Sequence, residues 1–289
     1  MPVATHFGPR MMPKNATDFV SFRVRPIGTA IGAEVEGVDL ARGVSGDLRE
    51  DLNRALLAWK VLFFRDQDIT SEQQRDVARQ WGELEVHPFL KAGDTPEVVR
   101  FEKDETTKGV ENIWHSDVTW RQIPSLGSIL RAVQVPALGG DTMWADMALA
   151  YDGLPEHVRD RVDGLTAVHD FSDSFGQSMS PDKLAKMREE FPPAEHPVIR
   201  VHPETGRRTI YVNEIFTSRI VGLDPEESSR LLGYLCAQAR VPEYQCRFHW
   251  EPNSIAFWDN RSTQHYAISD YWPAVRIMDR VTIVGDRPV

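Results

Sequence analysis

The chain has 289 residues, a mass of 32.9 kDa and a formal net charge of −10. Its hydrophobic fraction of 41% and charged fraction of 26% are typical of globular proteins and exclude a disordered or fibrous chain. The acidic balance argues against nucleic-acid binding, which needs clustered Lys and Arg, and no apolar run approaches the roughly 20 residues of a transmembrane helix. We therefore expect neither nucleic acid nor membrane as a partner.

The first 20 residues lack the apolar core of a secretory signal, and we interpret them as a flexible lead-in. Residues 21–289 contain no internal repeat or low-complexity segment and are expected to form a single domain. The two cysteines, Cys236 and Cys246, are too few and too widely spaced for a redox pair or a zinc site. They predict free buried thiols and a cytoplasmic location.

Five segments show helical patterns. Leucines recur at helical spacing in the first, and Thr70 and Gln73 form a capping-box pattern at the start of the second. A Ser-Pro or Asp-Pro pair opens each of the last two, which is a common helix start. The predicted helices cover residues 46–60, 70–81, 155–163, 181–191 and 225–239.

Short β-rich runs lie between and beyond these helices. They do not alternate regularly with the helices, which disfavours a doubly wound parallel sheet. Many short strands separated by Gly, Pro, Asn and Asp predict a mainly β fold with flanking helices, a double-stranded β-helix or jelly roll. The predicted strands are Val61–Phe64, Val98–Phe101, Ser128–Val135, Val198–Val201, Thr209–Val212, Cys246–Trp250, Ile255–Trp258 and Arg276–Val284.

A metal site is indicated by one of three H-x-[DE] triplets. The triplets at residues 202 and 249 lead into turns, whereas His115 and Asp117 stand in an extended apolar frame, residues 113–120. In a strand, residues two apart face the same side and can converge on one ion. His265, 148 residues after Asp117, can complete a set of two histidines and one carboxylate, which is typical of non-haem Fe(II) oxygenases. Ordinary hydrogen-bonded side chains remain the alternative.

Two arginines follow His265 on a predicted strand. Arg276 and Arg280 come 11 and 15 residues later and share one face of an otherwise apolar segment with Met278 and Thr282. Buried guanidinium groups need anions, and the planar fork of Arg suits carboxylates and sulfonates. The pair therefore indicates two anion sites beside a metal, with structural salt bridges as the alternative.

These motifs resemble the taurine dioxygenase family of Fe(II)- and 2-oxoglutarate-dependent oxygenases, and most of all its taurine-oxidising members. The resemblance extends from about Ile27 to Val289. The segments that carry it are Trp114–Thr119, Gly139–Trp144, His169–Phe171, Val212–Thr217, and Trp258–His265 through Arg280.

The resemblance implies roles for individual residues. Fe(II) would be bound by His115, Asp117 and His265, and 2-oxoglutarate, used together with O₂, by Arg276 and Thr142. The organic substrate would be surrounded by His87, Val118, Trp120, Phe175, Phe216 and Arg280. The region 85–112 is expected to cover the site as a lid, and the family suggests a homodimer or homotetramer.

The implied reaction is hydroxylation of the carbon next to a sulfonate, with taurine as the leading substrate and aminoacetaldehyde, sulfite, succinate and CO₂ as products. Two positions depart from the family pattern. Leu90 replaces a tyrosine, and the position of a family asparagine falls on Glu111, with Asn112 one place later. A lost polar partner costs about 1–3 kcal/mol, so alkyl sulfate esters and aryloxyalkanoates remain alternative substrates.

Two other classes remain open. A jelly-roll binding protein would hold the metal without catalysis. A zinc hydrolase would use similar ligands, but the chain has no H-E-x-x-H segment and such an enzyme would give Arg276 no role.

Overall fold

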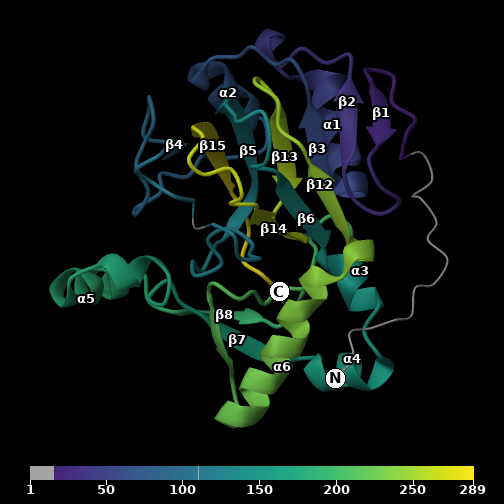
Figure 1. The fold of residues 1–289 in the computed structure, drawn as a ribbon. Helices are drawn as coiled ribbons and strands as arrows, with labels where there is room; N and C mark the ends of the chain where they lie inside the picture. Colours follow the sequence, from purple (N-terminus) through teal and green to yellow (C-terminus); the bar gives the residue numbers. More distant parts are fainter. Residues whose placement is uncertain (1–15, 110) are drawn as a thin grey trace.

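The computed structural model describes residues 16–109 and 111–289 (Figure 1). Of residues 16–20, expected to belong to the flexible lead-in, Ala16 and Phe19 pack against the body of the protein, whereas the other three are exposed. The indole N–H of Trp59 donates to the Ala16 carbonyl at 2.8 Å, and Phe19 stacks on Phe22. The rest of that expected lead-in, residues 1–15, lies outside the described residues.

Two facing sheets form the double-stranded β-helix that the sequence predicts. The larger sheet is almost entirely antiparallel and contains both the first and the last strand of the chain. In spatial order its strands are β1 (Arg23–Pro26), β2 (Ala33–Glu36), β3 (Val61–Phe64), β13 (Ile255–Asp259), β5 (Ser125–Gln134), β15 (Arg276–Val284) and β4 (Val98–Lys103). The smaller sheet contains β12 (Gln245–Phe248), β6 (Thr142–Asp146) and β14 (Thr263–Ala267).

Large aromatic side chains fill the space between the two sheets. Phe63 of β3 stacks on Phe248 of β12 with ring centroids 4.0 Å apart. Trp144 of β6 lies against Phe63 and against Trp258 of β13, and all are buried. This packing ties the sheets together and fixes the strands that carry the site residues described below.

Two helices cover the outer face of the larger sheet: α1 (Gly46–Trp59) and α2 (Ser71–Ala78). The predicted capping box at the start of α2 is present. The Thr70 hydroxyl accepts the Gln73 N–H at 3.1 Å, and the Gln73 side chain accepts the Thr70 N–H at 2.8 Å.

The other end of the molecule combines helices with two small sheets. There α3 (Met147–Asp152), α4 (Glu156–Val162) and α6 (Pro225–Ala237) pack around a second apolar core. One small sheet has the order β11 (Thr217–Ile220), β7 (Thr166–His169), β8 (Ala194–Pro197), and the other pairs β10 (Arg208–Ile210) with β9 (Ile199–Val201). Helix α5 (Pro181–Glu190) projects from the body and buries none of its residues (Figure 1). Four short 3₁₀ turns are η1 (Leu40–Arg42), η2 (Phe175–Ser178), η3 (Gln238–Arg240) and η4 (Pro242–Tyr244).

All five predicted helices and all eight predicted strands are present, with ends within three residues of the prediction. The elements that the sequence did not indicate are short: strands β1, β2, β6, β7, β8, β11 and β14 and helix α3. Both cysteines are free and buried, as predicted. Among the described residues, no helix has the length and apolar character needed to cross a membrane.

The contact between β5 and β13 leaves no room for a side chain at Gly127. An added Cβ would lie 2.3 Å from the Trp258 carbonyl oxygen, and both groups belong to the backbone, so neither can rotate away. We expect Gly127→Ala to lower the free energy of unfolding by about 1–3 kcal/mol, measured by urea denaturation.

Gly233→Ala is the matched control. This glycine lies in α6 with nothing within 4 Å of an added Cβ, and alanine is the better helix former by up to about 1 kcal/mol. The control should be neutral or stabilising. Equal urea midpoints for Gly127→Ala and the unchanged protein would contradict the steric argument.

Candidate functional site

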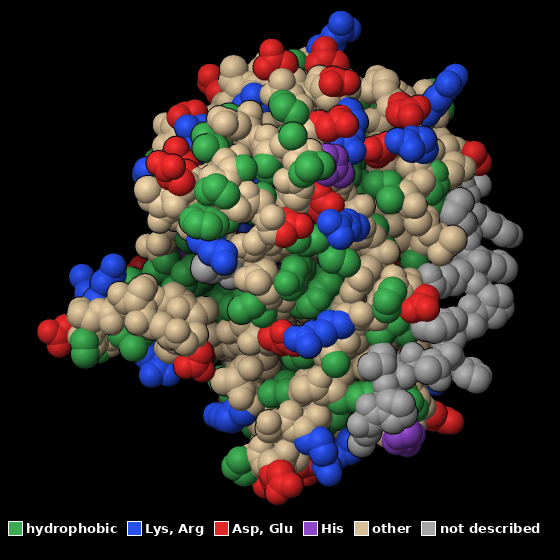
Figure 2. All heavy atoms as spheres, viewed as in Figure 1, with side chains coloured by type: hydrophobic (Ala, Val, Ile, Leu, Met, Phe, Trp, Pro, Cys, Tyr) green, Lys and Arg blue, Asp and Glu red, His purple; other side chains and the backbone are tan. Residues whose placement is uncertain are grey.

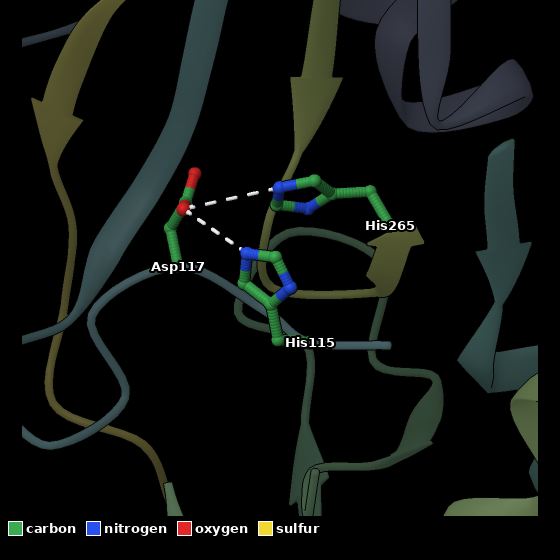
Figure 3. Close-up of side chains that lie close together, drawn as sticks. All are labelled: His115, Asp117 and His265. Atoms are coloured by element: carbon green, nitrogen blue, oxygen red, sulfur yellow. Dashed lines mark ion pairs between the residues drawn. The ribbon is translucent and has the colours of Figure 1, made fainter. Parts of the chain in front are cut away.

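Three side chains from two distant parts of the chain meet at one point (Figure 3). His265 lies on β14, and His115 pairs with it in an isolated antiparallel bridge, with backbone N···O distances of 3.1 and 2.8 Å. The Nε2 atoms of both histidines are 3.9 Å from Oδ1 of Asp117, and the three ligand atoms lie within 4.8 Å of one another. Groups this close can share one metal ion.

The local geometry differs from the extended frame expected over residues 113–120. The extended stretch ends at Ser116, and residues 117–120 form a turn in which Val118 has φ 47°. Asp117 therefore approaches His115 because the chain turns, not because the two share a strand face. A left-handed conformation costs a β-branched residue roughly 1–2 kcal/mol, and such strain persists where surrounding contacts hold it.

The protonation states suit a metal. Nδ1 of His115 donates to the Ile113 carbonyl at 2.8 Å, which leaves the Nε2 lone pair free. Burial lowers the pKa of His115 and lowers that of His265 to about 3, so both rings are neutral ligands at pH 7. Burial alone would raise the pKa of Asp117, but Arg280 and the two histidines outweigh it and hold that pKa well below its usual range. Two neutral imidazoles and a carboxylate form the donor set of non-haem Fe(II) sites.

Arg276 provides a site for an anion. Its side chain is buried, with Nε donating to the Gly140 carbonyl at 3.2 Å. No carboxylate among the described residues forms an ion pair with it, and it faces the cavity beside Thr142. The Thr142 hydroxyl accepts the Trp250 indole N–H at 2.9 Å, so its own proton is available to a bound ligand. A buried cation next to a free hydroxyl donor fits the carboxylate of 2-oxoglutarate.

Arg280 is placed differently. Its Nη1 lies 2.7 Å from Oδ1 of Asp117, so the salt-bridge alternative holds for Arg280, whereas Arg276 has no such partner in the described chain. The guanidinium also packs 5.0 Å from the Phe101 ring centroid, and its Nε is buried without a hydrogen-bond partner in the described structure. Arg280 thus neutralises Asp117 and keeps N–H groups on the cavity side for a second anion.

His87 faces the same cavity as a neutral donor. Its Nδ1 accepts the backbone N–H groups of Phe89 and Leu90, each at 3.2 Å, so the ring proton is on Nε2. Burial, reinforced by the nearby Arg280, lowers the pKa of His87 to about 3. Its role toward an anion is hydrogen bonding, not charge pairing.

These groups border a cavity of about 650 Å³ between the two sheets. On the face of the molecule drawn in Figure 2, basic and acidic side chains are intermixed. The Arg276 guanidinium, which pairs with no carboxylate of the described residues, is buried in the interior. The wall of the cavity is mainly apolar. Its lining includes Leu90, Phe101, Ile113, Val118, Leu130, Phe175, Ile215, Phe216 and Met278.

Two of the expected site residues do not border the cavity. Trp120 follows the turn at Val118 and is directed into an aromatic cluster behind the cavity wall, 5.2 Å from the Phe89 ring centroid. Asn112 is exposed, whereas Glu111 borders the cavity and pairs with Lys103 at 2.8 Å. All other expected site residues lie on the lining.

Several lining residues were not predicted from the sequence. Met278 stands between the two arginines on the face that the alternation had identified, so its place could have been inferred. Phe101 and Leu130 belong to predicted strands, but which strands border β15 is a matter of topology. Ile113 and Ile215 lie in irregular segments and had no signal in the sequence.

Comparison with known proteins agrees with this geometry. Residues 23–282 match the family model "Taurine catabolism dioxygenase TauD, TfdA family". The chain is 38% identical to an alpha-ketoglutarate-dependent sulfate ester dioxygenase of Pseudomonas putida over 275 residues, 92% of this chain and 90% of that protein. It is 35% identical to an alkylsulfatase of Acinetobacter baylyi over 272 residues, 91% of this chain and 85% of that protein.

A crystal structure of a taurine dioxygenase from Burkholderia xenovorans has the same fold. It superposes with a TM-score of 0.80 at 41% identity and covers 93% of each chain.

The buried environment of His87 leads to a prediction about its titration. With a folded-state pKa of about 3, its ¹⁵N NMR signals should show the Nε2–H tautomer and should not shift between pH 8 and 5. The unfolded chain takes up a proton on His87 near pH 6.5, and the folded chain takes one up only near pH 3. Protonation of the unfolded chain lowers the free energy of unfolding, so stability is lost as the pH falls from about 6.5 to about 3. The His87→Gln variant assigns the signals, and a midpoint above pH 5 would contradict the prediction.

Proposed function

The chain belongs to the TauD, TfdA family of iron- and 2-oxoglutarate-dependent dioxygenases, and from this we propose that it oxidises the carbon bearing a sulfonate or sulfate ester group in a substrate with an apolar tail. The observation that carries the proposal is the pair of arginines on β15, one without a carboxylate partner and one beside the metal ligands, at the end of a largely apolar cavity.

Bound Fe(II), 2-oxoglutarate and O₂ supply the oxidising power of the reaction. One oxygen atom enters the substrate, and the other enters succinate as 2-oxoglutarate loses CO₂. Hydroxylation at the carbon next to a sulfonate gives an aldehyde and sulfite. At the carbon next to a sulfate ester oxygen it gives an aldehyde and sulfate.

The protein residues bind and orient the reactants. His115, Asp117 and His265 would hold the iron, and Arg276 with Thr142 would hold the far carboxylate of 2-oxoglutarate. The sulfur-bound oxygens would accept hydrogen bonds from remaining N–H groups of Arg280 and from Nε2–H of His87. This arrangement would place the adjacent carbon toward the iron and the remainder of the substrate along the apolar wall.

The tail end of the cavity favours an alkyl chain over the ammonium group of taurine. Leu90 offers no hydrogen bond there. Of the acids on the lining, Glu111 and Glu214 already pair with basic side chains, Asp117 pairs with Arg280, and Asp173 is exposed to solvent. Taurine is the second candidate, supported by the 41% identity to the Burkholderia enzyme. Aryloxyalkanoates are the third candidate. They carry a carboxylate, whereas we propose that the donors of Arg280 and His87 bind a sulfur oxyanion.

The proposed role of Arg276 can be tested by mutation. Its replacement by alanine leaves one end of 2-oxoglutarate without a charge partner in a buried site, a change that commonly costs 2–5 kcal/mol. We expect KM for 2-oxoglutarate to rise at least about 30-fold while KM for the organic substrate changes little. Arg280→Ala is the comparison, and it should act mainly on the organic substrate. Equal effects of both variants on both constants would contradict this division.

The proposed preference for an apolar tail can be tested by comparing substrates. Each buried methylene contributes about 0.8 kcal/mol, so kcat/KM should be at least about tenfold higher for hexyl sulfate than for taurine. Release of sulfate or sulfite, measured together with succinate, gives the coupled turnover. Hexanesulfonate separates the oxyanion from the tail, and phenoxyacetate tests a carboxylate. Taurine as the better substrate would refute the apolar-tail proposal, and failure of all sulfur oxyanions to couple with succinate formation would refute the proposed reaction.

A further inference from the structure

Asn260 contacts the backbone of a metal ligand with both ends of its side chain. It lies in the turn between β13 and β14 and is fully buried. Its Oδ1 accepts the Asp117 N–H at 2.7 Å, and its Nδ2 donates to the Asp117 carbonyl at 3.0 Å. The side-chain amide therefore takes the place that a neighbouring strand would occupy beside Asp117.

The same amide joins a third segment to this contact. Its Nδ2 lies 2.9 Å from the Ser125 hydroxyl and 3.3 Å from the Ser125 carbonyl, and the backbone N–H of Asn260 donates to Leu126 at 2.9 Å. Asn260 thus connects the metal-binding turn, the start of β5 and the turn that leads into β14, which carries His265.

The metal-binding turn needs such support. Asp117 lies outside every strand, so its buried N–H and carbonyl have no backbone ladder to join. The next residue, Val118, has φ 47°, a strained conformation for a β-branched side chain. A turn without a fixed partner on this side could relax this strain by moving the Asp117 carboxylate away from the two histidines.

A buried hydrogen-bond network holds the turn that carries Asn260 in place. Asp259, the residue before Asn260, is buried and accepts two hydrogen bonds from the Arg261 guanidinium, at 2.9 and 2.7 Å. The His202 ring lies 2.9 Å from the same carboxylate, and Glu204 binds the other side of Arg261 at 2.7 Å. Movement of Asn260 would disrupt this network.

We propose that Asn260 is a positioning residue of the metal centre. It holds the Asp117 carboxylate in register with His265 and thereby raises the affinity of the site for a divalent ion. The proposal rests on the proposed metal-binding role of Asp117 and adds a residue that contacts neither the ion nor the substrate. Residues that orient metal ligands commonly change metal affinity 10- to 100-fold when they are replaced.

The test compares metal affinity with stability in Asn260→Asp and Asn260→Ala. Asn260→Asp keeps the size and one acceptor but loses both N–H donors and places a carboxylate against two carbonyl oxygens. Anaerobic Mn(II) titration, followed by electron paramagnetic resonance below the unfolding temperature of each variant, should show a Kd raised about 10- to 100-fold. With Fe(II) and 2-oxoglutarate, the weak visible charge-transfer band should shift or broaden.

The control is Glu204→Gln. It weakens the Arg261 ion pair in the same buried network and the hydrogen bond from Asn53, without contacting Asp117. We expect a lower unfolding temperature and an Mn(II) Kd within about twofold of the unchanged protein. This separates a loss of positioning from a general loss of stability.

Unchanged Mn(II) affinity in folded Asn260 variants would overturn the proposal and leave the proposed function standing. If the unchanged protein binds no Mn(II), or if Asp117→Ala binds it equally well, the metal role fails and both proposals fall. If neither Asn260 variant folds, hydrogen exchange of the unchanged protein decides the question. If the Asp117 amide is as well protected as those of the central strands, the positioning role of Asn260 is supported, and rapid exchange of that amide overturns it.

Discussion

The site depends on one contact between segments that are far apart in sequence, the two-hydrogen-bond bridge between His115 and His265. It joins an irregular loop to β14, and β14 is in turn fixed by pairing with β6 and by the aromatic core between the sheets. Because the two imidazoles are carried by paired residues, the backbone hydrogen bonds fix the spacing of their Cα atoms, and only the side-chain torsions remain to place the rings. Asp117 completes the group from a turn, which makes its position the least determined of the three by secondary structure.

The two arginines of β15 show how identical side chains acquire different roles from their neighbours. Alternation along the strand turns both toward the cavity, while Asp279 between them points to the opposite face and pairs with Arg100 at 2.7 Å. Arg280 lies within reach of Asp117, whereas Arg276 donates to the Gly140 carbonyl and packs near the ring of Tyr271. Among the described residues that line the cavity, Lys103 and Arg280 form ion pairs with carboxylates and Arg276 does not. With His87 neutral, positive charge is concentrated at the arginines and at any bound metal ion.

The sequence predicted the parts of this arrangement that follow from local rules. Pro and capping residues marked α2, α5 and α6, and alternation identified the inward face of β15. Strands β6 and β14 contain five residues each with mixed side chains, and their strand character comes from pairing with each other and, for β6, with β12. The orientation of Trp120 could not be predicted, because it depends on the left-handed conformation of Val118. The hydrogen bonds of Asn260 to the backbone of Asp117 could not be predicted for a similar reason. They depend on a buried network that follows no sequence spacing.

The chemistry and the selectivity of the site reside in different parts of the fold. Thr142, His265, Arg276 and Arg280 belong to strands held by the core. His115 and Asp117 lie outside the strands and are tied to them by the bridge to His265 and by the hydrogen bonds of Asn260. The proposed iron and 2-oxoglutarate positions would therefore change little when surface segments change. The apolar tail region is bordered largely by irregular segments, around residues 87–90, 111–113, 173–177 and 214–216. Substitutions there alter which substrate fits without moving the reacting centre. This separation explains how proteins that act on sulfate esters and on taurine can share 35–41% identity with this chain. In the proposed function, substrate selectivity therefore depends on residues such as Leu90 and Ile215 and not on the metal ligands.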